Sequence, residues 1–492
     1  LADAVNAPLW GDVDNDGLVD VYLCRRGPNQ LWRQSSPGVW ADITESAGVS
    51  NGDHDTVDGA LVDADHDGDL DVFVVNADAP DDLLSNNLDG TFRSIGADRG
   101  IDGAERASRQ VLVADLDADR DADIVVLHEA PPHDVFLNDR MWAYSRAPGV
   151  EAFAGADLVA VVHADLDADG VTDLIALDRQ GNLRHWAWSD GLAGGDVVVA
   201  SAIPPSEAER ATIAALDATG DGSVDVLVAT PAGWSLYAPS AEWAVVQRDD
   251  TPSVVPVWDD ALVGHRLIGH QRADDGTVRL LAHDPVRTPP ASFAALALSG
   301  AHDPGQSMRT NASAIGARVA ARVGTQWTVL DTFRNTSGPG QSLQPLAIGL
   351  GGAPAIDFIE IDWPDGVFQS EIDVPAGELT RVAETQRQLS SCPVLFAWNG
   401  DRYEFVTDLL GVGGIGYAIG PDQYAEARPW ENVLLPDGVA HRTADGHYSL
   451  LLTEPMEEAC YLDSARLVAY DLPPGWQMVL DERMGISDPQ PT

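Results

Sequence analysis

Short apolar runs separated by polar turns recur along the first half of the chain. Residues 72–75 (VFVV) and 124–127 (IVVL) are rich in branched side chains and are bounded by Asp, Asn and Gly. Runs of this length and composition indicate β-strands. Further short apolar segments follow, such as residues 83–84 (LL) and 135–137 (VFL). The pattern predicts an all-β fold built from short strands and tight turns.

A repeat of about fifty residues organises these strands. An Asp-rich turn of the form D-x-D-x-D-G, closed by a further Asp, begins at positions 12, 63, 115, 165 and 217. The starts are separated by 51, 52, 50 and 52 residues, and a fixed period of this size is typical of propellers and solenoids. Four strands in each repeat form a propeller blade. Residues 1–285 are therefore predicted to be a β-propeller of four-stranded blades, with five Asp-loop blades and a degenerate sixth blade.

The composition changes after about residue 290, where the Asp loops stop. Alternating strands such as residues 317–323 (ARVAARV) and 358–363 (FIEIDW) predict a small β-domain over residues 291–386. A second β-module is predicted over 390–475, around the Asn399-Gly400 turn, and residues 476–492 read as an extended tail.

Two family resemblances follow from these segments. The blades resemble the FG-GAP/VCBS repeat through residues 29–33 (NQLWR) and 40–44 (WADIT). The following domain resembles the ASPIC/UnbV domain, which is commonly found after such propellers and whose biochemical role is poorly defined. Residues 390–475 resemble the β-module that follows this domain in some bacterial proteins. The segments that carry the ASPIC/UnbV resemblance are 311–319 (NASAIGARV), 348–351 (IGLG), 363–366 (WPDG) and 373–376 (DVPA).

The Asp loops have the chemistry of a calcium site. Ca²⁺ prefers six to eight oxygen ligands, and a D-x-D-x-D-G turn offers carboxylates at alternate positions, while Gly permits the sharp bend. We expect positions 1, 3, 5 and 9 to converge on Ca²⁺, with the carbonyl of position 7 as a further ligand. The predicted metal ligands are, loop by loop, Asp12, Asp14, Asp16 and Asp20; Asp63, Asp65, Asp67 and Asp71; Asp115, Asp117, Asp119 and Asp123; Asp165, Asp167, Asp169 and Asp173; and Asp217, Thr219, Asp221 and Asp225.

Other readings of the loops are weaker. An EF-hand needs Glu at position 12 and flanking helices, whereas Leu23 and Val74 occupy that position inside apolar runs. A turn that only separates two strands would not need a closing Asp in all five loops. The third and fifth loops should bind most weakly, because Arg120 replaces the bending Gly and Thr219 offers only a hydroxyl.

Net charge restricts the partners. The chain has a formal charge of −49, from 60 Asp and 18 Glu against 29 Arg and no Lys. Such a surface repels nucleic acid and anionic lipid. The excess of Asp over Glu fits short carboxylates at fixed loop positions, although a GC-rich genome or a high-salt habitat would also explain the absence of Lys.

The expected location is extracellular, at the cell surface or periplasmic. No apolar run approaches the roughly 20 residues of a membrane span, so no membrane insertion is expected. The chain opens with Leu1, as a processed form or a fragment would. Extracellular calcium modules have dissociation constants on the order of 10⁻⁴–10⁻³ M, which would leave them empty in a cytosol.

Three cysteines, Cys24, Cys392 and Cys460, are too few for a disulfide scaffold or a Cys-type zinc site. Cys392 and Cys460 could pair or remain reduced, and the sequence leaves both open.

Catalytic motifs are weak. Residues 411–416 (GVGGIG), with Glu431 further on, match a dinucleotide fingerprint, but Gly420-Pro421 follows where a helix is required. The His128 to His133 segment has the wrong spacing for a zinc protease and contains two prolines. Trp186 and Trp188 fit a glycan platform or, at strand spacing, the core.

The sequence therefore predicts a non-catalytic, calcium-binding propeller that acts as an interaction module for a protein or glycan ligand. Two alternatives remain: a propeller-based carbohydrate-active enzyme, and an accessory protein of a biosynthetic or assembly pathway.

Overall fold

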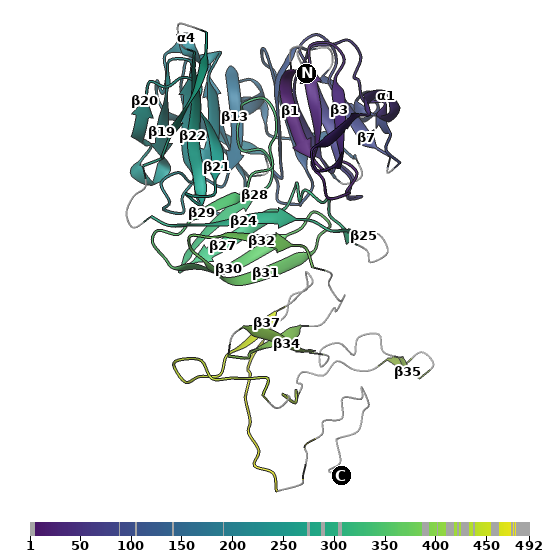
Figure 1. Ribbon diagram of the computed structural model, residues 1–492, viewed down its shortest axis with the longest axis vertical. Helices are drawn as coiled ribbons and strands as arrows, with labels where there is room; N and C mark the ends of the chain where they lie inside the picture. Colours follow the sequence, from purple (N-terminus) through teal and green to yellow (C-terminus); the bar gives the residue numbers. More distant parts are fainter. Residues whose placement is uncertain are drawn as a thin grey trace. The chain divides into compact units, whose positions relative to one another are not determined.

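The computed structural model of the chain (Figure 1) describes residues 5–385 except 88, 104–105, 140–141, 190, 273–275, 287–290 and 304–307. Towards the C-terminus it describes residues 393–400, 402–409, 418–420, 423–424, 432–435, 438–453, 462–473, 476 and 478. The chain divides into two compact units, Leu1–Gln386 and Arg387–Thr492.

Five four-stranded antiparallel sheets follow one another in the first unit, and in each sheet the strands pair in chain order. The first two sheets are Val5–Gly11 (β1), Asp20–Arg25 (β2), Gln30–Ser36 (β3) and Val39–Asp42 (β4), then Thr56–Val62 (β5), Asp71–Asn76 (β6), Asp82–Asn86 (β7) and Phe92–Ser94 (β8). The next two are Ser108–Ala114 (β9), Asp123–His128 (β10), Asp134–Leu137 (β11) and Ser145–Arg146 (β12), then Leu158–Ala164 (β13), Asp173–Asp178 (β14), Leu183–Trp188 (β15) and Leu192–Val199 (β16). The fifth is Thr212–Leu216 (β17), Asp225–Thr230 (β18), Gly233–Ala238 (β19) and Ala244–Asp249 (β20).

Each Asp loop joins the first two strands of its sheet. The residue before the loop pairs with the closing aspartate, as Gly11 does with Asp20 and Ala114 with Asp123. The first strands of consecutive sheets pack on one another, β1 on β5, β5 on β9, β9 on β13 and β13 on β17. The sheets are therefore blades around a common axis, which the first strands line. The all-β propeller predicted from the sequence is confirmed.

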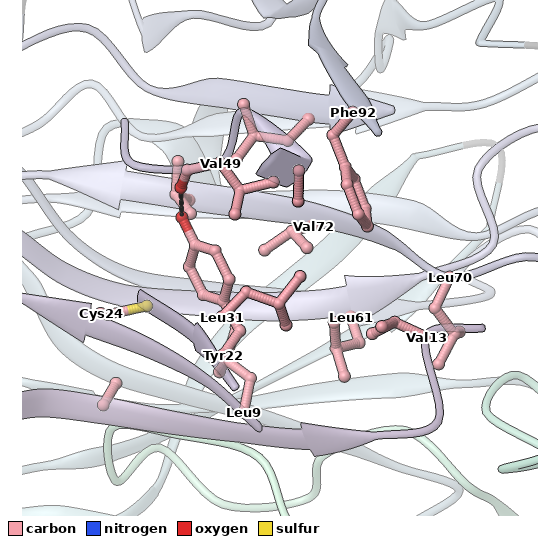
Figure 2. Close-up of a cluster of buried hydrophobic side chains, with 14 of the residues drawn as sticks. Leu9, Val13, Tyr22, Cys24, Leu31, Val49, Leu61, Leu70, Val72 and Phe92 are labelled. Atoms are coloured by element: carbon pink, nitrogen blue, oxygen red, sulfur yellow. Dashed lines mark hydrogen bonds between the residues drawn. The ribbon is translucent and has the colours of Figure 1, made fainter. Parts of the chain in front are cut away.

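Apolar side chains fill the space between neighbouring blades. Between the first and second blades, Leu9, Leu31, Leu61 and Val72 are fully buried, and Figure 2 shows them with Tyr22. The Tyr22 hydroxyl donates to the carbonyl of Val49 at 2.9 Å, so its one polar group is satisfied within the core. Alternation along each strand thus buries both faces of the inner blades.

One-turn helices, absent from the sequence prediction, lie in the connections between blades. They are Thr44–Ala47 (α1), Gly96–Arg99 (α2), Glu151–Ala154 (α3) and Pro205–Ala208 (α4), with a 3₁₀ turn at Pro239–Ala241 (η2). The first two end at Gly48 and Gly100, whose φ angles of 75° and 71° favour glycine.

The sixth sheet has three strands and no Asp loop: Val255–Asp259 (β21), Gly264–Arg272 (β22) and Val278–His283 (β23). Leu267 and Val254 are buried in the cluster that contains the side chains of the fifth blade. On β21, in contrast, Val255 and Val257 are exposed. A three-stranded sheet thus lies where residues 253–285 were predicted to form a degenerate blade.

A β-domain, here named the β24–β32 domain, completes the first unit. One sheet orders β29-β24-β32, with β24 and β32 parallel, and the other orders β28-β27-β30-β31. Val319, Ile359 and Trp363 lie in the core that the two sheets share. Its strands are Phe293–Ser299 (β24), His302–Asp303 (β25), Met308–Arg309 (β26), Arg318–Val323 (β27), Gln326–Asp331 (β28), Leu346–Gly349 (β29), Ala355–Asp362 (β30), Phe368–Pro375 (β31) and Leu379–Ala383 (β32).

The connection between β28 and β29, residues 332–345, enters the propeller axis and is named the axial loop. Arg334 forms a two-pronged ion pair with Asp58 of β5 at 2.7 and 2.8 Å, with both residues buried. Gln341 pairs with Leu9 of β1, and Thr336 with Ala214 of β17. The axis is therefore filled by a segment from the β24–β32 domain.

The second unit has a three-stranded sheet, ordered β34-β33-β37, and a two-stranded one. Its strands are Val394–Trp398 (β33), Tyr403–Asp408 (β34), Ala418–Gly420 (β35), Gln423–Tyr424 (β36) and Leu450–Thr453 (β37). Cys392, Cys460, Glu431 and residues 411–416 lie outside the described residues, whereas Cys24 is a buried free thiol. Among the described residues, none of the helices has the length and apolar character needed to span a membrane.

Candidate metal centres

Three carboxylates of the Asp loop converge in each of the first four blades. In every group, one oxygen from each residue lies within 4.8 Å of an oxygen of the others. The groups are Asp12, Asp14 and Asp20; Asp63, Asp65 and Asp67; Asp115, Asp117 and Asp123; and Asp165, Asp167 and Asp173. Each of four consecutive blades thus gathers three carboxylates at the same turn.

The groups use different loop positions. Loops one, three and four bring together positions 1, 3 and 9, whereas the second loop brings together positions 1, 3 and 5. Position 5 has a further role, since Oδ1 of Asp16 and of Asp169 each accepts the backbone N–H two residues on, at 2.9 Å. The same bond forms at Asp67, Asp119 and Asp221. Position 5 therefore shapes the turn in every loop.

Position 1 and the glycine at position 6 fix the bend. The N–H of Gly17 donates to Asp12 at 2.7 Å, and the N–H of Gly170 donates to Asp165 at 3.1 Å. Gly17 and Gly170 have φ angles of 86° and 88°, in the left-handed region that favours glycine. Arg120 adopts φ 77° at the same place, so the third loop keeps the bend without glycine.

Position 9 anchors the loop to the blade, a role that the sequence prediction missed. Asp123 accepts the N–H of Leu116 at 2.8 Å and that of Asn138 at 2.9 Å. Asp20 likewise accepts the backbone N–H of Gln34, 14 residues on, and Asp71 accepts that of Asn86, 15 residues on. An amide side chain at that spacing was the signal that could have revealed it.

Crowding and burial disfavour the ionised form of these aspartates. Burial raises the pKa of Asp20 to about 7, with the charges of Asp14 and Asp12 adding to the shift. Burial and the neighbouring carboxylates likewise raise the pKa of Asp115 to about 7 and that of Asp123 to about 9. Without a cation, the loops would hold carboxylates in an unfavourable environment.

Several aspartate oxygens in the loops have no hydrogen-bond partner. Asp63 Oδ1, Asp115 Oδ1 and Asp117 Oδ1 are buried and accept no hydrogen bond. Buried acceptors without a partner are uncommon, because losing water without replacement is unfavourable. A cation with oxygen ligands would satisfy them, and the flexible, all-oxygen preference of Ca²⁺ matches such a donor set.

The fifth loop differs from the other four. Among the described residues its carboxylates do not form such a group. Asp221 accepts a hydrogen bond from the Ser240 hydroxyl at 2.9 Å. Thr219 Oγ1 and Asp225 Oδ1 are nevertheless buried without a hydrogen-bond partner. The fifth loop therefore keeps two buried oxygens without a partner, at positions 3 and 9.

A serine, histidine and aspartate meet at the opposite end of the third blade. Ser108 Oγ lies 3.1 Å from His128 Nδ1, and His128 Nε2 lies 3.1 Å from Asp134 Oδ2. All three side chains are 1% exposed, so no substrate reaches them. Ser108 also donates to Asp81 at 2.7 Å, as one member of a buried structural network.

Two tryptophans considered for glycan binding serve the core instead. Trp186 is buried against Phe153, with ring centroids 5.3 Å apart, and Trp188 packs on the same cluster.

A cavity of about 590 Å³ lies between the inner blade strands, the sixth blade and the β24–β32 domain. Asp260, Asp331 and Trp258 line it, together with His163 and His265. Nδ1 of both histidines is buried without a hydrogen-bond partner. The cavity combines an aromatic ring, carboxylates and unsatisfied imidazole nitrogens.

Among solved structures, the chain is similar to an Agrocybe aegerita lectin that recognises non-reducing terminal N-acetylglucosamine. The identity is 16% and the TM-score 0.42, over 57% of this chain and 81% of the lectin. It is also similar to the BP39L lectin of Burkholderia pseudomallei, at 13% identity and TM-score 0.39, over 75% and 97%. Sqt1 of Saccharomyces cerevisiae matches at 10% identity and a TM-score of 0.38, over 76% of this chain and 96% of Sqt1. With TM-scores this low, the fold is assigned from the chain's own sheets.

No curated protein sequence matches the chain. Two protein families do. The FG-GAP-like repeat matches residues 12–74 and 63–126, which contain the first three Asp loops. The ASPIC and UnbV family matches residues 306–389, which include most of the β24–β32 domain. The chain therefore contains FG-GAP-like repeats over residues 12–126 and an ASPIC and UnbV domain over residues 306–389, as its sequence motifs predicted.

Proposed function

We propose that the chain is a calcium-binding propeller that serves as an interaction module for a protein or glycan ligand outside the cytoplasm. The observation that carries the metal assignment is the set of four three-carboxylate groups, one in each of four consecutive blades. Chance proximity on an acidic surface would not place them at the same turn each time.

Calcium would neutralise the clustered carboxylates and hold each turn closed. Within the first loop, Asp12, Asp14 and Asp20 would hold it, and equivalent aspartates would do so in the next three. Hydrogen bonds to positions 1, 5 and 9 shape the backbone of each turn, and calcium would hold its carboxylates together. The fifth loop, with Thr219 at position 3, would bind most weakly.

Calorimetric titration of the metal-free full chain tests the metal assignment. Asp65→Asn preserves the shape of the side chain but removes a charge from the second group, so it should remove one binding event. Asp98→Asn, on an exposed residue of α2 directly after the same blade, is the matched control and should leave the titration unchanged. Equal titrations for wild type and Asp65→Asn would reject the assignment.

Ligand binding is tested separately, on glycan and protein arrays probed with and without Ca²⁺. We expect binding that EDTA abolishes and that Ca²⁺ restores. The extracellular, cell-surface or periplasmic location is supported only by the weak affinity usual for such sites, on the order of 10⁻⁴–10⁻³ M. Fractionation of the source cells tests it.

A carbohydrate-active enzyme is the second candidate, and the 590 Å³ cavity is the observation that favours it. Asp260 and Asp331 provide carboxylates there that belong to no Asp loop. Hydrolysis of polysaccharides by the wild type, lost in Asp260→Asn, would support this candidate. Unchanged hydrolysis in that variant would assign the activity elsewhere.

A further inference from the structure

The β24–β32 domain contacts all five Asp loops of the propeller. At the first loop, Ser313 Oγ accepts the N–H of Asp12 at 2.8 Å, and the N–H of Ala312 donates to Asn15 Oδ1 at 2.8 Å. At the second loop, His66 Nδ1 donates to the carbonyl of Pro364 at 2.9 Å. These bonds involve the backbone N–H of Asp12 and the side chains of two other loop residues, Asn15 and His66.

The other three loops are held in the same way. Arg120 of the third loop lies 2.9 Å from Asp362, and Arg318 donates to the carbonyl of Gly170 in the fourth loop at 3.1 Å. In the fifth loop, Thr328 donates to the carbonyl of Gly222 at 2.9 Å. In the fourth and fifth loops the acceptors are backbone carbonyls inside the turn, so these two bonds depend on the path of each turn.

Neighbouring loops are also joined to one another through position 4 of one loop and position 7 of the next. Asn15 Nδ2 donates to Asp69 Oδ1 at 2.8 Å. His66 Nε2 lies 2.8 Å from Asp121 Oδ1. A change of path in one turn is therefore passed to the adjacent loop.

The axial loop extends the same docking into the propeller. The N–H of Ser337 donates to Ile213 of β17, and that of Gln341 donates to Pro8 of β1. The N–H of Gly340 donates to the Asp58 carboxylate of β5. These bonds need the β24–β32 domain to be seated on the loop face, because the axial loop is anchored in that domain at both ends.

We infer that the metal loops are a docking surface for the chain's own β24–β32 domain, and that metal binding and docking strengthen one another. The inference rests on the proposed calcium binding. With the carboxylates held together, each turn presents its carbonyls at the places where Arg318 and Thr328 bind them. Without a cation, repulsion opens the turns and these bonds are lost. By reciprocity, a seated domain raises the affinity of the loops for the metal.

Hydrogen exchange of the full chain, in Ca²⁺ and in EDTA, tests the coupling. Chelation should speed exchange at Ser337, Gly340 and Gln341 by about tenfold or more, as expected for coupling free energies of ordinary size. Strands β22 and β23, whose blade has no Asp loop, should change much less. Equal acceleration in both regions would indicate general loosening and would overturn the inference.

The reverse direction uses two variants on one strand. Arg318→Met removes the bond to Gly170 and should weaken calcium binding by about two- to tenfold, the usual effect of one hydrogen bond. Arg322→Met, on an exposed residue four positions along β27, is the control and should bind calcium as the wild type does.

The outcomes separate the two proposals. If calcium binds and neither the axial loop nor Arg318→Met responds, the coupling is wrong and the proposed function stands. If calorimetry detects no calcium binding at all, both are wrong.

Discussion

The two ends of the third blade treat a buried aspartate in opposite ways. At the Asp-loop end, burial and the charges of Asp117 and Asp115 raise the pKa of Asp123 to about 9. At the other end, Asp134 is bonded by Arg106, Arg146 and His128. Burial alone would raise the pKa of Asp134, but these hydrogen bonds and charges outweigh it and lower the pKa to about 2.

The two ends differ in the positively charged partners of their buried aspartates. The chain neutralises a buried carboxylate with its own cations where only internal stability is required. At the loop end it brings together Asp115, Asp117 and Asp123, and among the described residues no arginine forms an ion pair with any of these three carboxylates. Under the proposed calcium binding, a divalent cation would supply the positive charge at this end.

Metal removal should affect stability most. One site occupied at ten times its dissociation constant adds about 1.4 kcal/mol to the free energy of unfolding. Four such sites correspond to a fall in Tm of about 10–20 °C on adding EDTA, measured by differential scanning calorimetry. An unchanged melting curve would contradict the claim that the Asp-loop ends, unlike the opposite ends, are stabilised by a bound cation.

Asp134→Asn should lower the free energy of unfolding by less than metal removal does. The variant leaves Arg106, Arg146 and His128 around a neutral group, and breaking a buried ion pair costs about 3–5 kcal/mol. The loss should be the same with Ca²⁺ and with EDTA, because distant sites act independently. Chemical denaturation in both conditions measures it. A loss that appears only in Ca²⁺ would connect the two ends.

Acid should erase the difference between this variant and the wild type. Since folding lowers the pKa of Asp134 from 3.8 to about 2, its stabilisation is present above about pH 4 and is lost as the pH falls towards 2. The free energies of unfolding of wild type and Asp134→Asn should converge over that range. A constant difference down to pH 2 would contradict the assigned role.

Asp65→Asn should have a smaller effect, since it removes one of several sites. We expect a loss of about 1–2 kcal/mol in Ca²⁺ and little change in EDTA, whereas the exposed Asp98→Asn should stay within about 0.5 kcal/mol in both. Thermal unfolding of the three proteins, side by side, measures this. Equal losses in EDTA would assign Asp65 a structural role instead.

Thr219→Asp should have the smallest effect on stability and should sharpen the comparison among loops. The substitution gives the fifth loop a carboxylate at position 3, as in the other four. At a Ca²⁺ concentration that fills the first four loops but not the weaker fifth loop, the number of bound ions should rise by one. Native mass spectrometry counts them. An unchanged count would indicate that the surroundings of the fifth loop, rather than Thr219, weaken it.

Much of the fold was predictable because the repeat is local. A strand, an Asp loop and a second strand are adjacent in sequence, so the positions of Asp12, Asp14 and Asp20 could be read from spacing. A degenerate sixth blade was also predicted, because residues 253–285 contain strand-like runs and no Asp loop, but its three strands could not be counted from the sequence.

Contacts between distant segments could not be predicted. Arg334 and Asp58 are 276 residues apart, and nothing local to either residue indicates that they form a buried ion pair. Which loop positions come together was likewise hidden, because Asp16 and Asp20 are the same residue type with different backbone partners. Ser108, His128 and Asp134 come from three strands and share no motif.

The central claim is tested most directly by counting the ions bound to the metal-free chain as Ca²⁺ is added, by native mass spectrometry. The account predicts at least four calcium ions per chain, with one fewer in Asp65→Asn. A chain that binds none, or that binds the same number in wild type and Asp65→Asn, would contradict it.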